Sequence, residues 1–133
     1  MTVNNEFFPQ RPKSHPMIYA YSDNNPQYIG LLKIGYTENS VEQRVAQQYP
    51  TRRPDGVNPY KIVLSESAMR NDGTCFTDHD VHRYLRKKKV TGVGGEWYRC
   101  SATDVSAAIV AIKTGIENSE NRTLTFGMRP EQN

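Results

Sequence analysis

The order of apolar and polar positions predicts a β-hairpin near the start of the chain. Residues 18–21 and 31–36 are rich in β-branched and aromatic side chains, which favour extended strands. The segment between them contains Ser-Asp-Asn-Asn-Pro at residues 22–26, and these residue types favour turns. We therefore expect two antiparallel strands joined by a polar turn.

A helical pattern follows the hairpin directly. Ser40 is a favourable N-cap, and Gln43 stands three residues later, where it can complete a capping box. The next apolar residues fall on one helical face before Pro50: Val41, Val45 and Tyr49. This face would pack on the hairpin and bring the neighbouring Arg44 close to the strands.

The remaining pattern adds one strand and two helices. Residues 60–65 alternate between apolar and polar side chains, which predicts a third strand. Its apolar face holds Tyr60, Ile62 and Leu64. A second helix is expected from about Cys75 to Lys88, and a third is expected to begin after Ser101 as its N-cap. The predicted fold class is therefore α+β, with a small, mostly antiparallel sheet of three to four strands flanked by about three helices.

Composition is consistent with one domain. The chain has 133 residues, of which 36% are hydrophobic, enough for a single modest core. We expect residues 1–16 to be a flexible segment, residues 17–116 to be the folded domain and residues 117–133 to be a linker. No stretch has the apolar core of a signal peptide or the roughly 18 apolar residues of a membrane span. A soluble, cytoplasmic protein is therefore expected.

The positive charge of the chain is concentrated in one segment. The formal net charge is +3, and five of the seven residues at 83–89 are basic, so the remainder of the chain is net negative. Such a patch is typical of proteins that bind a polyanion, and its residues are Arg83, Arg86, Lys87, Lys88 and Lys89. Arg52 and Arg53 are two further candidate phosphate contacts. The glycines at residues 92–95 lack the Lys-Ser/Thr ending of a P-loop, so we expect flexible backbone there and no ATP binding.

The cysteine and histidine spacing does not predict a metal cage. Cys75 and Cys100 are the only cysteines, and they form no CxxC motif. The histidines show no paired spacing typical of a structural metal site. We expect both cysteines to be packing residues in a reducing compartment.

The hairpin and the first helix carry an ordered set of motif residues. Met17-Ile18-Tyr19 lies in the first predicted strand, Lys33-Ile34-Gly35 and then Thr37 lie in the second, and Arg44 follows nine residues after the glycine. This set resembles the two short motifs and the helix arginine of the GIY-YIG nuclease superfamily. Tyr28-Ile29-Gly30 spells the second motif literally, but its spacing to a threonine and to the arginine does not fit. Lys33-Ile34-Gly35 is therefore the match.

Lysine in the second motif is similar to the phage-type branch of that superfamily. The later signature of the branch is an acidic residue four positions before a histidine in a helix, followed by Gly-Glu-Trp-aromatic. Asp78 with His82, and then Gly95-Glu96-Trp97-Tyr98, are similar to both. The resemblance covers about residues 17–112.

This resemblance implies a metal-dependent DNA endonuclease that hydrolyses phosphodiesters. Tyr19 and Lys33 would activate the attacking water, and Arg44 would hold the scissile phosphate. Glu96 would bind one Mg²⁺ or Mn²⁺ ion, and His82 would be a further catalytic residue. The supporting residues would be Gly35, Thr37 and Asp78. These side chains are expected to converge on one concave face, with the basic run at its mouth.

Two positions depart from the family pattern. Many relatives carry a histidine four residues after the helix arginine, where this chain has Gln48, and a glycine where it has Met17. His82 is a candidate to replace the missing histidine, with Asp78 fixing its tautomer. The alternative is that Asp78 only accepts a hydrogen bond from His82 and stabilises the helix.

The end of the chain suggests a larger protein. Arg129-Pro130-Glu131-Gln132 is similar to the start of superfamily 2 helicase motors. The resemblance therefore implies a downstream helicase domain, in a helicase or restriction-type protein.

Two other functions remain open. One is a catalytically weak DNA-binding module that positions a helicase. The other is a protein docking domain without nucleic-acid binding, which would show no salt-sensitive affinity for DNA.

Overall fold

The computed structural model describes residues 15–116 of the chain. Its elements are β1 (Met17–Asp23), the 3₁₀ helix η1 (Pro26–Tyr28), β2 (Leu31–Thr37), α1 (Val41–Gln47), β3 (Tyr60–Ser67), α2 (Asp78–Lys87), β4 (Gly92–Gly94), β5 (Trp97–Arg99) and α3 (Ala102–Thr114). The predicted linker at residues 117–133, the helicase-like segment within it and most of the predicted flexible segment at residues 1–16 lie outside the described residues.

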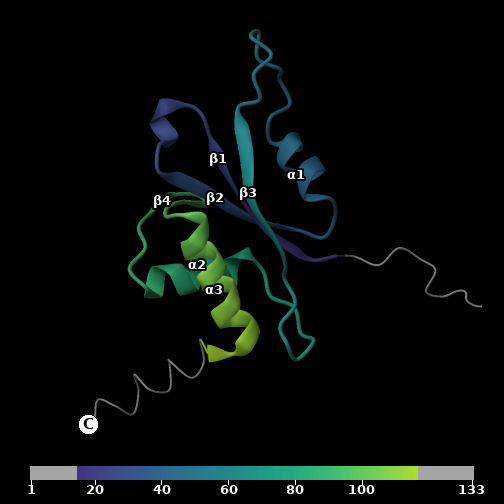
Figure 1. Cartoon of the computed structure of the whole chain (residues 1–133), viewed down its shortest axis with the longest axis vertical. Coiled ribbons are helices and arrows are strands. Elements are labelled where there is room, and N and C mark those ends of the chain that lie inside the picture. Colours follow the sequence, from purple (N-terminus) through teal and green to yellow (C-terminus); the bar gives the residue numbers. More distant parts are fainter. Residues whose placement is uncertain (1–14, 117–133) are drawn as a thin grey trace, which may run out of the picture.

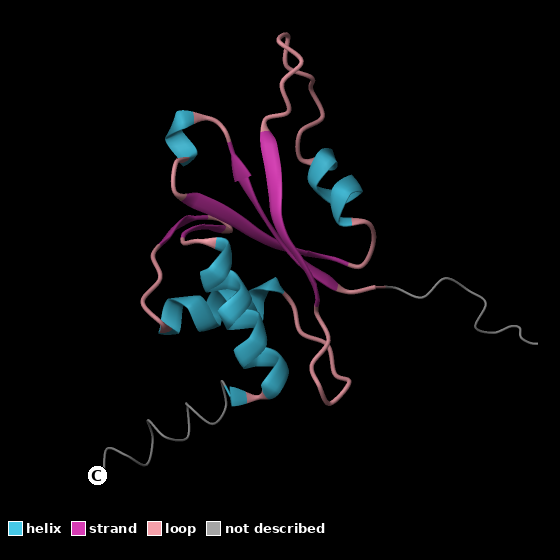
Figure 2. Ribbon diagram, in the orientation of Figure 1, coloured by secondary structure: helices cyan, strands magenta, loops and turns pink. Residues whose placement is uncertain are grey.

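The strands form one antiparallel sheet in the order β3-β1-β2-β5-β4. The predicted hairpin is confirmed and lies near the centre, with Tyr19 opposite Gly35 and Tyr21 opposite Lys33. Figure 1 shows α2 and α3 packed together, with α1 well apart from them beside β3. Figure 2 shows the twisted strands crossing the middle of the molecule between these helices. The α+β class is therefore confirmed.

Strand alternation divides the core into two clusters. Ile18 and Ile34 are fully buried on the face that α2 and α3 cover, which we call the α2/α3 face. Tyr19 and Tyr21 point the other way and pack against the apolar side of α1, on what we call the α1 face. Because successive side chains of a strand alternate between faces, each face of the sheet receives its own helix layer.

β3 departs from the predicted alternation at one point. Ala20 of β1 lies opposite Leu64. The next residue, Tyr21, lies opposite Ile62, so Val63 is left as an extra residue. This β-bulge reverses the alternation, and Leu64 is therefore buried on the α2/α3 face while Ile62 packs on the α1 face. The prediction that Leu64 shares a face with Ile62 is wrong.

Two predicted helix starts are confirmed. The Ser40 hydroxyl accepts a hydrogen bond from the backbone N–H of Gln43 at 3.2 Å, at the start of α1. Ser101 and Asp104 form a capping box at the start of α3, which satisfies two backbone N–H groups of its first turn. None of the helices within residues 15–116 is long and apolar enough to cross a membrane.

The segment before α2 is extended instead of helical. Cys75 pairs with Met69 in a β-bridge, and Thr77 then caps the helix through a capping box with Asp80. α2 therefore begins at Asp78, and the predicted start at Cys75 is wrong. The Cys75 side chain is also exposed, so the prediction that it packs in the core is wrong as well.

The sheet has five strands, one more than the upper end of the predicted range. The glycine-rich segment forms β4 and the turn into β5 instead of a flexible connection. Gly94 and Gly95 have φ angles of 130° and 57°, which residues with side chains rarely adopt. These two glycines close a tight hairpin and place Glu96 at its end.

Candidate active site

Tyr19 and Gly35 meet across the central hairpin. They are paired in register on β1 and β2, and the Tyr19 ring lies directly over Gly35. A Cβ atom at position 35 would overlap with the phenol ring, so glycine makes room for the tyrosine. Tyr28-Ile29-Gly30, in contrast, lies in η1 and the turn that follows it. The choice of Lys33-Ile34-Gly35 as the motif that faces Tyr19 therefore agrees with the structure.

Gly35→Ala is expected to lower the free energy of unfolding by about 1–3 kcal/mol, the usual cost of overpacking. Replacing glycine inside a strand otherwise gains roughly 0.5–1 kcal/mol, so the sign of the change reports on the contact with Tyr19. The measurement is denaturant-induced unfolding. Gly92→Ala is the control, because a Cβ there lies 3.2 Å from the Tyr98 ring and needs only a small shift. A Gly35→Ala protein as stable as the parent would contradict the close contact.

Thr37 fixes the start of the helix that carries the arginine. Only 7% of Thr37 is exposed, and its hydroxyl accepts a hydrogen bond from the Asn39 backbone N–H at 3.1 Å. This bond shapes the turn from β2 to the Ser40 cap of α1. Thr37 therefore acts on the position of Arg44 through the backbone.

Gln48 joins three side chains of the sheet. It is the C-cap residue of α1. Its Nε2 donates a hydrogen bond to the Tyr19 hydroxyl at 3.0 Å. Its Oε1 accepts one from Lys33 Nζ at 2.8 Å and another from the Tyr21 hydroxyl. We call these four residues the Tyr–Lys–Gln cluster. Tyr19 and Lys33 are thus brought together as predicted, through a residue that the motif pattern marks only as a departure.

The partners of Gln48 fix which way its side-chain amide points. An ammonium group can only donate, so the amide oxygen of Gln48 must face Lys33 and its NH₂ group must face Tyr19. The Tyr19 oxygen is then the acceptor, and within residues 15–116 its own O–H has no acceptor. Tyr19 is only 1% exposed. A buried hydroxyl with an unused proton is a place where a water molecule or a phosphate oxygen can bind.

Gln48→Ala is expected to lower the free energy of unfolding by about 1–3 kcal/mol, because it leaves the Tyr21 hydroxyl and Lys33 without their acceptor. Gln47→Ala is the matched control. The Gln47 side chain is exposed, so its truncation should change stability by less than about 0.5 kcal/mol. Denaturant-induced unfolding of both variants and of the parent tests this. If Gln48→Ala is as stable as Gln47→Ala, the hydrogen bonds of the cluster contribute nothing to the stability of the fold.

Tyr21 is a supporting member of the cluster. Its ring packs edge-on against Trp97 and Tyr49, with centroid distances of 5.7 and 5.8 Å. Burial raises the pKa of Tyr21 to about 12. Its hydroxyl therefore stays protonated at neutral pH and remains a donor to Gln48.

Arg44 lies one helical turn before Gln48, on the same side of α1. Its side chain is exposed and forms no hydrogen bond or ion pair with any other residue of the described range. The guanidinium is therefore available to an anion beside the Tyr–Lys–Gln cluster. That the Arg44 guanidinium emerges near Tyr19 and Lys33 stays a prediction.

Glu96 lies in the turn between β4 and β5. Its backbone oxygen accepts a hydrogen bond from the Ile34 N–H at 3.0 Å, which ties the turn to β2. Its carboxylate is partly exposed and makes no hydrogen bond or ion pair between residues 15 and 116. Besides burial, the charge of Glu96 contributes to the raised pKa of Tyr21. The carboxylate is thus within electrostatic reach of Tyr21 in the cluster.

His82 lies on the α2/α3 face and not with the cluster. Its ring stacks on Tyr98 with a centroid distance of 5.0 Å, and its Nε2 donates a hydrogen bond to the Ile34 carbonyl at 2.9 Å. The structure therefore does not bring His82 to Tyr19, because α2 packs on the opposite side of the sheet. The Ile34 carbonyl, and not Asp78, fixes the tautomer of His82.

A cavity of about 420 Å³ lies beside the cluster, between the end of α1 and the loop before β3. Tyr49 and Tyr60 form part of its wall, with ring centroids 4.9 Å apart. Tyr49 also packs against Tyr21 of the cluster. The cavity therefore extends the α1 face with an aromatic surface.

Arg52 and Arg53 line this cavity. Arg53 is held by one hydrogen bond to Asn24 Oδ1 at 2.8 Å and by an ion pair with Asp55 at 3.3 Å. Arg52 has neither a hydrogen bond nor an ion pair within the part of the chain that the structure describes. The structure thus brings both arginines to the side of the sheet that carries Arg44.

The basic run of α2 lies elsewhere. Arg83 pairs with Asp80, and Arg86 Nη1 donates a hydrogen bond to the Tyr98 hydroxyl at 2.9 Å. All five basic residues are exposed: Arg83, Arg86, Lys87, Lys88 and Lys89. The sequence predicts that these residues lie at the mouth of the site. Because α2 packs on the α2/α3 face, the structure does not gather them around the Tyr–Lys–Gln cluster.

Sequence reasoning misses two members of the cluster. Gln48 could have been found, because it follows Arg44 by four residues and so lies on the same side of the helix. Tyr21 gives no such signal, since an alternating strand pattern identifies its face but not the partner of its hydroxyl.

Comparison with known families identifies one domain. The T5orf172 domain matches residues 17–113, which include every residue described above as part of the candidate site. The search of curated proteins and the search of solved structures find no match. The match spans the whole sheet and all three helices almost to the end of α3.

Proposed function

The chain belongs to the T5orf172 domain family, which is linked with endonuclease-like domains, and we propose that it is a metal-dependent DNA endonuclease of the GIY-YIG type. The observation that carries this proposal is the set of polar groups on the α1 face. Tyr19 and Lys33 meet at Gln48, with Arg44 one turn away and Glu96 within electrostatic reach.

The reaction is the attack of water on a phosphodiester, in line with the bond that breaks. Tyr19 first releases its own hydroxyl proton to solvent, and its phenolate oxygen then orients the attacking water and accepts the proton of that water. The N–H of Gln48 and the ammonium of Lys33 stabilise the negative charge that develops on this side of the site. Arg44 holds the scissile phosphate through charge-assisted hydrogen bonds. Because Tyr19 is buried in the described arrangement, the side chains that cover its hydroxyl must open when the substrate enters, while Gln48 keeps its N–H on the Tyr19 oxygen.

Glu96 fits the role of a ligand for one Mg²⁺ or Mn²⁺ ion. Its carboxylate is partly exposed and has no hydrogen-bond or ion-pair partner within residues 15–116, so it can bind a cation without losing an internal contact. One carboxylate suits Mg²⁺, which keeps several waters and takes further oxygens from phosphate. When bound, such an ion supplies positive charge beside the leaving oxygen.

The loop that carries Arg52 and Arg53 is the best candidate for the DNA-binding surface. It lies on the same face as Arg44 and borders a cavity walled by Tyr49 and Tyr60. Cations contact phosphates and aromatic rings contact bases, which is a common combination in nucleic-acid binding. The basic run of α2 is a second patch that a longer or bent DNA would reach around the sheet edge.

Replacing both Arg52 and Arg53 by Ala is expected to lower the salt slope of DNA binding by about 1.8, from roughly 0.9 per phosphate contact. Replacing Lys87, Lys88 and Lys89 by Ala lowers it by about 2.7 if all three contact phosphate. Binding to one duplex at several salt concentrations measures both changes. A smaller salt slope in the Arg52/Arg53 variant alone would assign DNA binding to the α1 face. An unchanged salt slope in both variants would mean that neither group of residues contacts phosphate.

The proposed function is tested with end-labelled duplex and branched oligonucleotides in Mg²⁺. We expect cleavage that leaves a 3′-hydroxyl and a 5′-phosphate, and none when a chelator is present. Binding without cleavage would instead support a DNA-binding module. Neither binding nor cleavage would support a protein docking domain.

A further inference from the structure

Asp78 is a buried carboxylate that has no hydrogen-bond or ion-pair partner among residues 15–116. It is the first residue of α2 and only 7% exposed. Within the described residues its carboxylate accepts no hydrogen bond and forms no ion pair. A buried carboxylate is costly unless a proton, a cation or a hydrogen-bond donor compensates its charge.

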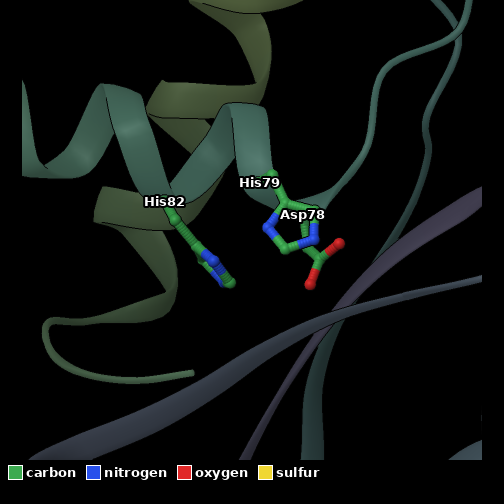
Figure 3. A group of neighbouring side chains, drawn as sticks. All are labelled: Asp78, His79 and His82. Atoms are coloured by element: carbon green, nitrogen blue, oxygen red, sulfur yellow. The ribbon is translucent and has the colours of Figure 1, made fainter. Parts of the chain in front are cut away.

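Two histidines stand next to this carboxylate. One ring nitrogen of His79, one of His82 and one carboxylate oxygen of Asp78 all lie within 4.8 Å of one another. Figure 3 shows the three side chains leaving the first turns of α2 on the side that faces the strands. His82 is 5% exposed, whereas His79 is exposed. The group is therefore closed on the protein side and open to solvent at His79.

The tautomer of His82 prepares it for coordination. A carbonyl oxygen only accepts hydrogen bonds, so the 2.9 Å contact with Ile34 places the proton on Nε2. The neutral ring then has its free lone pair on Nδ1. A histidine that donates its other N–H to a backbone carbonyl is the arrangement found behind most metal-binding imidazoles.

We propose that Asp78, His79 and His82 bind one divalent transition-metal ion of the zinc type. Two imidazoles and a carboxylate are the donor set that such ions prefer, whereas Mg²⁺ prefers oxygen ligands. Three protein ligands leave a position of the tetrahedral ion for water, which fits the exposure of His79. Metal–ligand bonds of about 2.0–2.2 Å require the three ligand atoms to move closer to one another. Rotation of the exposed His79 ring can bring them together.

This site is separate from the candidate active site. It lies on the α2/α3 face, while Arg44 and the Tyr–Lys–Gln cluster lie on the α1 face. The bound ion would neutralise Asp78 and tie the first turn of α2 together. The positive end of the helix dipole opposes a cation there, and the carboxylate of Asp78 offsets it.

The experiment titrates untagged, metal-free protein with Co²⁺, whose visible absorption reports coordination by protein ligands, and then displaces it with Zn²⁺. His79→Gln is the decisive variant, because this exposed residue can be changed without disturbing the core. Asp78→Asn is the second variant, with circular dichroism to check its fold. His15→Gln removes the chain's third histidine, and Glu66→Gln removes a partly exposed carboxylate of β3 that lies outside both proposed metal sites. These two are the controls.

We expect one Co²⁺ per chain, displaced by Zn²⁺, and binding that is weaker by at least about tenfold in His79→Gln and in Asp78→Asn. Both controls should bind as the parent does. Absence of a Co²⁺ spectrum in the parent, or unchanged affinity in the His79→Gln protein, would overturn the proposal. The titration contains no DNA, so its outcome is independent of whether the protein cleaves DNA.

Discussion

Glu96→Gln is expected to lower the rate of Mg²⁺-dependent DNA cleavage by about two or more orders of magnitude while DNA binding persists. Glutamine keeps the size of the side chain but removes the charge that would hold the ion. The Glu96 carboxylate has no internal partner within residues 15–116, so the substitution should leave stability unchanged. The variant should bind DNA at least as tightly as the parent, because the loss of one negative charge favours association with DNA.

The matched control is Glu66→Gln. Glu66 lies on β3 opposite Ile18, whose side chain belongs to the α2/α3 face. This variant removes the same charge from a position away from the cluster, and it should cut DNA as fast as the parent. Equal cleavage by the Glu96→Gln protein, in both Mg²⁺ and Mn²⁺, would mean that Glu96 does not hold the ion.

Arg44→Ala is expected to lower cleavage by about 100- to 1,000-fold, the usual effect of removing one group that stabilises transition-state charge. DNA binding should weaken only modestly, because the guanidinium contacts phosphate more strongly as charge builds up. Arg44 is exposed and has no partner inside the described range. A loss of cleavage therefore cannot be attributed to a broken internal contact.

Two further variants sharpen this result. Arg44→Lys keeps the positive charge but loses the planar fork that binds two phosphate oxygens, so it should recover only part of the activity. Lys61→Ala removes an exposed cation from the edge strand β3 and should have no effect on cleavage. If Arg44→Ala and Lys61→Ala cut DNA equally fast, Arg44 does not contact the scissile phosphate.

Local patterns in the sequence are enough to predict the strands and the helix that carry the centre of the candidate site. The alternation around Tyr19 and Lys33 sets their face of the sheet, and the Ser40 cap sets where α1 begins. Because Arg44 follows Gly35 by nine residues, it must lie near the start of α1. Each of these features depends on residues close together in the chain, where propensity and periodicity are informative.

Contacts between distant residues could not be predicted in this way. The bulge at Val63 arises from pairing with β1 and moves Leu64 to the other face. The hydrogen bonds of Gln48 depend on how α1 crosses the sheet. His82 was expected beside Tyr19, but helical spacing gives no information about which face of the sheet α2 will cover.

The same limitation explains why the sequence does not predict the proposed metal site of Asp78, His79 and His82. Asp78 and His82 are recognisable as an i, i+4 pair on a helix, and this spacing suggests a hydrogen bond between them. The Ile34 carbonyl takes the His82 N–H instead. Within residues 15–116, the buried Asp78 carboxylate is thereby left without a hydrogen-bond or ion-pair partner, which no pattern within the helix itself can reveal.

The most direct test of the central claim is a time course of supercoiled plasmid with the parental protein in Mg²⁺, run beside the same reaction with a chelator. A site built from Tyr19, Lys33, Arg44 and Glu96 predicts conversion of supercoiled to open-circular DNA in Mg²⁺ and none with the chelator. No conversion in Mg²⁺ or Mn²⁺, at protein concentrations where the plasmid is bound, would contradict it.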